Sequence, residues 1–218
     1  METYATEEQQ WEAIKQWFKK YGNRISWALI IILSIVLSVQ YWTHHQTVLK
    51  EQASESYMAL LTGVEQHDEA TVKSKAQNLM TQYPDSPYAS LAALFLTNQS
   101  IEAKDYPKAE ENLNWIMQHG KPNLQGLARV RLMRLMVSQN KLDEALALYN
   151  EDKAPGFLTL LAELKGDILM KKNDVEGAKT FYEKALSLAP EEGMHGPLLK
   201  MKLESLGVTV NDNKGVKK

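Results

Sequence analysis

The residues of this chain that could do chemistry are few, and their spacing does not favour a catalytic or metal-binding site. None of the five histidines stands four residues from another, the spacing at which two imidazoles on one helix face bind a zinc ion. His44 and His45 are neighbours, but side chains at successive helical positions diverge. We therefore interpret this pair as polar residues at an interface, and we predict no metal ion and no cofactor.

Carboxylates could support general acid–base catalysis, but the pairs in this chain, Glu110-Glu111 and Glu191-Glu192, are adjacent residues. Such pairs are typical of solvated helix faces and helix N-termini. The chain has no cysteine, which excludes a thiol nucleophile, a disulfide and cysteine-ligated zinc. The sequence also lacks the motifs of serine hydrolases, zinc proteases and phosphate-binding loops. We predict that the protein is not an enzyme.

The informative features concern position and packing, beginning with an uncharged apolar run from Ile25 to Trp42. As a helix these eighteen residues would be about 27 Å long, which matches the hydrocarbon core of a bilayer. We predict a transmembrane helix over residues 25–42, with arginine and aromatic side chains in the headgroup layers at its two ends. These predicted interface residues are Arg24, Trp27, Tyr41 and Trp42.

A buried core helix and a cleaved signal peptide are the alternatives to a membrane span. A core helix would show a polar stripe, which the run lacks. A signal peptide has a short basic start and a small-residue cleavage site, whereas 24 residues precede this run and no such site follows it. The sequence therefore favours an uncleaved anchor.

Residues 1–24 are predicted to form a cytoplasmic amphipathic tail. Its apolar residues recur at spacings of three and four, which places them on one helix face. The tail is either an ordinary solvated helix or a helix in the inner headgroup layer, and its aromatic content favours the second. The face comprises Trp11, Ile14, Phe18 and Tyr21.

The distribution of basic residues predicts the orientation of the anchor. Four lysines and arginines lie within about fifteen residues before the apolar run, whereas Lys50 is the first basic residue after it. Because basic flanks stay in the cytoplasm, we expect a cytoplasmic N-terminus and an exported segment over residues 43–218.

Beyond Thr43 the sequence predicts only helices. Apolar residues recur at helical spacing, proline and glycine fall between segments, and no alternating pattern of branched residues appears. The last residues, 207–218, lack periodicity and are expected to be disordered. The predicted helices are 47–66 paired with 69–82, 86–103 with 105–119, 123–139 with 141–151, 157–172 with 174–188, and a final helix at 196–206.

An internal repeat indicates how these helices pack. Gly166, Ala178, Tyr182, Ala185 and Pro190 stand where the 34-residue tetratricopeptide repeat (TPR) has small, aromatic and helix-ending residues. Weaker matches recur upstream at intervals of 33 to 37 residues. We predict an all-α fold, in which a single N-terminal transmembrane helix precedes a TPR-like α-solenoid over residues 43–206. The solenoid would have about four helical hairpins and a C-terminal capping helix.

The concave side of a solenoid is lined by the first helix of each pair and usually binds partners. Its mixture of aliphatic and ionic groups suits extended polypeptide better than a small substrate. Some apolar members could instead pack against the next pair. The predicted protein-binding residues are Leu94, Asn98, Ile101, Glu102, Val130, Arg134, Val137, Ser138, Glu163, Asp167, Met170 and Lys171.

The chain resembles a known family in its aromatic and basic tail, its single anchor and three further segments. These segments are Leu79-Met-Thr-Gln-Tyr-Pro-Asp-Ser-Pro-Tyr-Ala89, Asp143-Glu-Ala145 and Lys172-Asn-Asp-Val-Glu-Gly-Ala178. The family is that of the bacterial ancillary SecYEG translocon subunits. The resemblance implies an inner-membrane protein with a periplasmic domain. It also implies two partners, the SecYEG channel and a membrane-anchored periplasmic chaperone of the prolyl-isomerase type.

Two functional hypotheses follow from these features. The first is a membrane-anchored scaffold beside the SecYEG channel that binds a periplasmic chaperone, emerging unfolded polypeptides, or both. The alternative is an envelope-stress regulatory protein whose cytoplasmic tail contacts a signalling partner. A net charge of −2 gives no indication of a nucleic-acid partner.

Overall fold

A computed structural model of the 218-residue chain describes residues 7–190 and 195–208. Within these ranges the regular elements are nine α-helices and one short 3₁₀ turn, so the predicted all-α fold is confirmed. The elements are α1 Glu7–Glu65, α2 Glu69–Gln82, α3 Pro87–Glu102, α4 Tyr106–His119, α5 Pro122–Ser138, α6 Leu142–Ala147, the 3₁₀ turn η1 Pro155–Phe157, α7 Leu158–Lys171, α8 Val175–Leu188 and α9 His195–Ser205.

Helix α1 is one continuous helix of 59 residues, where the sequence predicts a tail, a span and a separate helix from residue 47. No glycine or proline lies between Gly22 and Gly63, so nothing in the chain interrupts the helix. The helix belongs to two compact units, the first ending at Gln52 and the second beginning at Ala53. The assignment of these segments to cytoplasm, membrane and periplasm stays a prediction.

In the first unit the apolar run is exposed along its length. Its large side chains from Leu29 to Val39 expose 53% to 62% of their surface. The hydroxyl groups of Ser34 and Ser38 donate to helix carbonyls at 2.8 and 2.7 Å, so they need no other partner. Among the described residues, α1 alone is long and apolar enough to cross a membrane, and none of its apolar window is buried. The buried-core alternative therefore does not hold.

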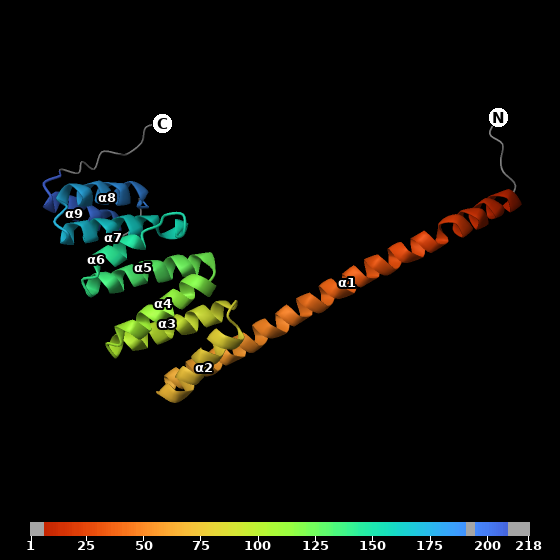
Figure 1. Cartoon of the computed structure of the whole chain (residues 1–218), viewed down its shortest axis with the longest axis horizontal. Coiled ribbons are helices and arrows are strands. Elements are labelled where there is room, and N and C mark those ends of the chain that lie inside the picture. The colour runs from red at the N-terminus through yellow and green to blue at the C-terminus, as the bar shows by residue number, and fades with distance from the viewer. Residues whose placement is uncertain (1–6, 191–194, 209–218) are drawn as a thin grey trace. The chain divides into compact units, whose positions relative to one another are not determined.

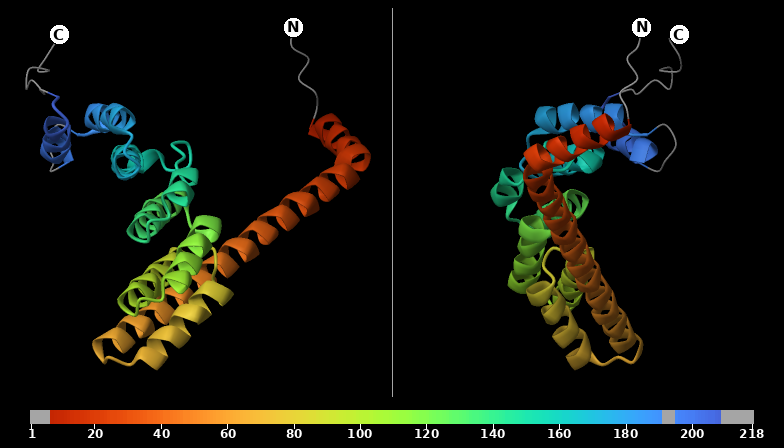
Figure 2. Two further views of the ribbon diagram at one scale, coloured as in Figure 1. Left: turned by 60° about the vertical axis from the view of Figure 1, so that its left-hand side comes forward. Right: turned by 90° about the vertical axis from the view of Figure 1, so that its right-hand side faces the viewer.

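In the second unit the helices form successive antiparallel pairs (Figures 1 and 2). The end of α1 packs with α2, α3 with α4, α5 with α6, and α7 with α8, while α9 packs on α8. Four hairpins and a terminal helix agree with the predicted TPR-like architecture. Each hairpin contacts the next along the chain, which gives the unit its one-dimensional order.

The same turn joins the two helices of every hairpin. A residue just beyond the first helix has a left-handed backbone, with φ between 56° and 63°, although it is not glycine. The N–H of the following residue donates to the carbonyl five residues earlier and closes the end of the first helix. These left-handed residues are His67, Lys104, Asn140 and Asn173.

In three of these four turns the next residue is an aspartate that caps the second helix. Asp68, Asp105 and Asp174 accept hydrogen bonds from the N–H three residues further on, at 3.1, 3.2 and 2.9 Å. In the third turn the position is Lys141, whose side chain makes no cap hydrogen bond. Helices α2, α4 and α8 each have 14 residues, whereas the uncapped α6 has six.

The end of α6 corrects a sequence prediction. The predicted helix 141–151 is too long, because the chain leaves the helix after Ala147. The side chain of Asn150 then accepts a hydrogen bond from the N–H of Lys153 at 3.1 Å, which stabilises a turn in place of another helical turn.

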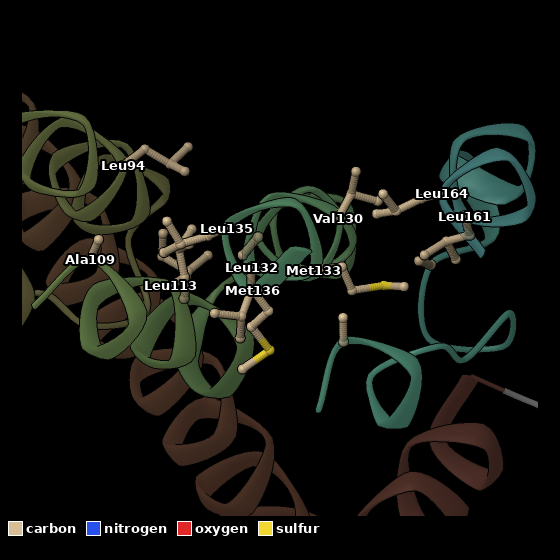
Figure 3. Packing of buried hydrophobic residues seen from close by; sticks show 14 of the residues in the cluster. Leu94, Ala109, Leu113, Val130, Leu132, Met133, Leu135, Met136, Leu161 and Leu164 are labelled. Carbon is tan, nitrogen blue, oxygen red and sulfur yellow. The ribbon is translucent and has the colours of Figure 1, made fainter. Parts of the chain in front are cut away.

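Buried side chains form three clusters along the second unit. One joins α1, α2 and α3 through residues such as Leu60 and Leu79, and a central one joins α3 to α7. Figure 3 shows Val130 of α5 and Leu164 of α7 pointing toward each other in the central cluster. In the third cluster, Leu199 of α9 is buried with residues of α7 and α8. Each cluster therefore spans a joint, either between successive hairpins or between the fourth hairpin and α9.

Beyond α9, the structure describes two residues, Gly207 and Val208, that the sequence assigned to a disordered tail. Gly207 has φ 77°, and the N–H of Val208 donates to the carbonyl of Leu203 at 3.1 Å. These two residues close the helix in the usual glycine-ended manner. The rest of the predicted tail, residues 209–218, lies outside the described residues.

Candidate protein-binding surface

The candidate surface lies on α3, α5 and α7, the first helices of the second, third and fourth hairpins. All twelve residues that the sequence singled out are on these three helices, but their exposure differs. Three are buried, namely Leu94, Val130 and Glu163; three are half-buried, namely Val137, Asp167 and Met170; and six are exposed, namely Asn98, Ile101, Glu102, Arg134, Ser138 and Lys171.

On α3 the exposed residues lie toward its C-terminal end. Ile101 exposes 39% of its surface, while Leu94 exposes 8% and belongs to the central core. Asn98 accepts a hydrogen bond from Arg131 Nη1 on α5 at 3.5 Å. This contact places a polar bridge between two neighbouring first helices. Asn98 therefore lies next to α5 as well as to solvent.

On α5 the face alternates between core and solvent. Val130 is 1% exposed, and Val137 packs against the same central cluster. Arg134 is exposed, and Ser138 donates to the carbonyl of Leu135 at 2.7 Å. The aliphatic members thus hold the hairpins together, and Arg134 carries the charge that this helix offers to a partner.

On α7 the two predicted carboxylates are engaged by α9. Lys202 Nζ lies 2.7 Å from Glu163 Oε1 and 2.6 Å from Asp167 Oδ1. Tyr182 of α8 donates to Asp167 at 2.7 Å, and His195 Nδ1 lies 3.6 Å from Glu163 Oε2. These contacts bring together groups from three helices. The carboxylates therefore stabilise the terminal helix in this structure.

The lysine of this network is held in its charged form. Burial alone would lower the pKa of Lys202, but the hydrogen bonds to Asp167 and Glu163 outweigh it and raise that pKa above its ordinary value. Burial and the hydrogen bond to Asp167 also raise the pKa of Tyr182, so its hydroxyl remains a donor. At the end of α7, Met170 packs against the third cluster and Lys171 is exposed.

Sequence reasoning missed two residues of this surface, Arg131 and Lys202. Arg131 lies 33 positions after its partner Asn98, which is one repeat length. The repeat period therefore could have identified it. Lys202 lies 39 and 35 positions after its two carboxylate partners, in a helix outside the repeat pattern, so no period pointed to it.

The surface offers ionic and amide groups for hydrogen bonding. Among the described residues, no group of three or more histidines and carboxylates is placed to hold a metal. A hollow beside the first turn, lined by Gly63, Asp68, Phe95 and neighbours, has a volume of about 140 Å³. That volume is below the 300–1,000 Å³ typical of ligand sites. A second hollow of about 550 Å³ lies along α1, in the first unit, and is lined by Leu37, Tyr41, His44 and neighbours. The ionic and amide groups on α3, α5 and α7 are of the kind that contact another polypeptide.

The fold defines the chain as a helical repeat protein, and the comparison of sequences agrees. The family described as tetratricopeptide repeat-like domain matches residues 15–208. Three relatives carry the name ancillary SecYEG translocon subunit. The Haemophilus influenzae protein is 30% identical over 92% of this chain and 97% of its own length. The Escherichia coli protein is 26% identical, with 95% and 100% covered, and the Neisseria gonorrhoeae protein is 28% identical, with 94% and 100% covered.

The chain therefore belongs to the family of ancillary SecYEG translocon subunits, as its resemblance predicted. The family consists of non-catalytic scaffolds, which agrees with the prediction that the protein is not an enzyme.

Proposed function

We propose that the protein is a membrane-anchored scaffold that associates with the SecYEG protein-export channel. The observation that carries this proposal is the match over nearly the whole chain to relatives named ancillary SecYEG translocon subunits. The match includes α1, so it covers the predicted anchor as well as the repeat domain. Function therefore depends on both parts of the chain.

The anchor would be the exposed apolar part of α1, in the bacterial inner membrane. Its aromatic ends support this, since Trp27, Tyr41 and Trp42 expose 61%, 76% and 64% of their surface. Such rings prefer the headgroup layers of a bilayer, where Arg24 would also lie. With the basic flank inside, the N-terminus is cytoplasmic and the repeat domain periplasmic.

The repeat domain would bind protein through the exposed members of the α3, α5 and α7 surface. Its partners would be a membrane-anchored periplasmic chaperone of the prolyl-isomerase type, emerging unfolded polypeptides, or both. Arg134 and Lys171 offer cations, Glu102 an anion and Asn98 an amide, a set that can bind backbone and charged side chains of extended chains. Tethering confines this surface beside the channel and so raises its effective concentration there.

Replacing residues 1–42 by a cleavable export signal tests the tethering role. The freed domain should fold, because its three clusters of buried residues lie beyond Gln52, and it should no longer co-purify with SecYEG. A matched control replaces residues 25–42 by an unrelated apolar span of equal length and orientation. That control separates membrane location from specific contacts of the span. Undiminished co-purification of the freed domain would contradict the proposal.

Photocrosslinking in living cells tests the binding surface. A photoreactive residue at Asn98, Arg134 or Lys171 should capture channel, chaperone or exported polypeptide. The matched controls are Glu111 and Glu183, which are exposed on the second helices α4 and α8. Equal capture from both sets of positions would show that α3, α5 and α7 do not form the binding surface.

A further inference from the structure

The first turns of α1 carry large aromatic side chains, two of which are largely exposed. Trp11 exposes 59% of its surface and Trp17 exposes 53%, while Tyr21 is half-buried. The rings of Trp17 and Tyr21 lie 5.9 Å apart between centroids, so they form a joint surface. Tryptophans exposed in this way are uncommon on a helix that remains in water. The tail therefore presents an apolar face that lacks a partner within the described residues.

The basic residues of the tail that precede the span lie on both borders of this aromatic face. With about 100° per residue, Trp11, Trp17 and Tyr21 fall within an arc of about 120°. Trp17 is not among the residues predicted for this face, but its helical phase and its contact with Tyr21 place it there. Beyond one border follow Lys15 and Lys19, and beyond the other follow Lys20 and Arg24.

The lysines next to the rings turn toward them. Lys15 Nζ lies 5.6 Å from the centroid of Trp11, and Lys20 Nζ lies 5.5 Å from that of Tyr21. Their ammonium groups therefore sit at the edges of the aromatic face. Long basic side chains in this position can bury their aliphatic stems and reach phosphate groups at the same depth as the rings.

We propose that residues 11–24 of the tail bind the anionic lipid headgroups of the membrane that holds the span. Its aromatic face lies at the boundary between headgroups and acyl chains, and its basic borders contact lipid phosphates. This inference rests on the membrane anchor proposed above. The continuity of the chain supports a lipid occupant, since Arg24 directly precedes the apolar run and the tail therefore begins at the bilayer surface.

The helix needs a bend between tail and span to lie on the surface, and its sequence permits one. Gly22 and Asn23 are two weak helix formers in succession, and Gly22 is buried. In both views of Figure 2 the first turns of α1, drawn in red, run in a different direction from the rest of the helix. The tail can therefore lie along the membrane while the span crosses it.

The chain itself is well suited to the test, because it contains no cysteine. Each residue from 11 to 24 is replaced in turn by a spin-labelled cysteine in the full-length protein. The protein is reconstituted into vesicles of phosphatidylethanolamine and phosphatidylglycerol. Labels are then compared for access to oxygen, which concentrates in lipid, and to a water-soluble nickel complex. A label at Leu33 reports on the span in the same preparation.

The proposal predicts a helical pattern of access with a period of about 3.6 residues. Labels at Trp17 and Tyr21 should be reached by oxygen, and a label at Asn23, on the opposite side, by the nickel complex. Uniform access of the nickel complex along the tail, with Leu33 still shielded, would overturn the inference and leave the anchor intact. Access of the nickel complex to Leu33 would overturn the anchor itself, and this inference with it.

A second arm tests the role of charge. The triple variant Lys15→Gln, Lys19→Gln, Lys20→Gln should show a weaker access pattern than the parent chain in vesicles that contain phosphatidylglycerol. Both proteins should behave alike in vesicles of neutral phosphatidylcholine. If the parent chain gives the same pattern in both kinds of vesicle, the proposed contact with anionic headgroups is wrong.

Discussion

The fourth hairpin, α7 and α8, follows the repeat pattern, and the third hairpin, α5 and α6, departs from it at corresponding positions 33 residues earlier. Gly166 lies against the ring of Tyr182, whereas the third hairpin has the buried Met133 at the glycine position. Asp174 caps α8, whereas Lys141 leaves α6 without a side-chain cap. The same fold therefore tolerates two ways of closing a hairpin.

The tyrosine of the third hairpin does not pack within its own hairpin as Tyr182 does, but contacts the fourth hairpin. Tyr149 lies beyond the end of α6, and its ring meets Phe181 of α8 edge-on at 5.7 Å. Lys165 of α7 lies over both rings, at 4.3 and 4.1 Å from their centroids. Tyr149 also donates to Glu151, which pairs with Lys184 of α8. The irregular hairpin is thus stabilised by its regular neighbour.

In the first hairpin the large and the small residue have exchanged helices relative to the fourth hairpin. There the large Leu60 of α1 is buried in one cluster with the small Ala76 of α2, and both are 0% exposed. In the fourth hairpin the small residue is on the first helix and the large one on the second. Packing between the two helices of a hairpin thus combines one large and one small side chain, and either helix can supply the large one.

The largest effect should come from removing the ring that fills the fourth hairpin. Tyr182→Ala leaves a space over Gly166 and should lower the free energy of unfolding by about 3–5 kcal/mol. Tyr149→Ala should cost clearly less, because that ring is only half-buried. Urea unfolding of the full-length protein in detergent, followed by circular dichroism, measures both. Equal losses would remove the distinction drawn between the two hairpins.

A smaller loss of stability is expected from adding one methyl group where α7 meets the ring of Tyr182. A Cβ at Gly166 would lie 2.5 Å from the ring of Tyr182, so Gly166→Ala should destabilise by about 1–3 kcal/mol. The double variant with Tyr182→Leu should lose less than the sum of its single changes. Gly156→Ala is the control, since no atom lies within 4 Å of its new methyl group. A neutral Gly166→Ala would show that close approach is not required.

The difference in helix capping between the fourth and third hairpins should have a still smaller effect on the free energy of unfolding. Asp174→Ala removes the acceptor of the Gly177 N–H and should cost about 1 kcal/mol. Lys141→Ala, at the equivalent position, removes no cap and should cost less. Urea unfolding compares the two. A larger loss from Lys141→Ala would indicate that its ion pair with Glu110, at 2.6 Å, matters more than a helix cap.

The smallest effect concerns pH and the same ion pair. Partial burial would raise the pKa of Glu110, but hydrogen bonds from Lys141 and Gln139 outweigh it and lower that pKa below 4.5. Because the folded pKa is the lower one, this stabilisation is present above about pH 5 and is lost as the pH falls through the lowered pKa. Glu110→Gln should therefore flatten the acid side of the stability profile. An unchanged profile would contradict the role of the carboxylate.

Sequence reasoning succeeded where local signals determine the element. Helix α2 was predicted over residues 69–82 and has those bounds, because Asp68 caps its start and Pro84 follows its end. It failed for α6, since the position of Tyr149 depends on Phe181 and Lys165, which lie in later helices. Likewise, helical periodicity could not show that α1 continues from the apolar run into the first hairpin.

The candidate surface was predictable only in part, for a related reason. The repeat pattern correctly places its residues on the first helices, but exposure depends on the elements packed over them. Glu163 and Asp167 are engaged because Lys202 arrives from α9, which is not part of the repeat. Leu94 and Val130 are buried because adjacent hairpins meet there. These outcomes require the assembled structure.

The side-chain hydrogen bonds between hairpins, and those from α9 to α7, have a consequence for how such proteins can change over time. Among the described residues, examples such as Arg131 to Asn98 and Lys202 to Glu163 join positions 33 and 39 apart. Such bonds join a hairpin to its neighbour along the chain and α9 to the fourth hairpin. Duplication or deletion of one of the earlier units inside the gene would leave the remaining joints in place, provided that the third hairpin still precedes the fourth and α9 still ends the series. The number of hairpins, and with it the length of the repeat domain, can in this way change during evolution while the fold is kept.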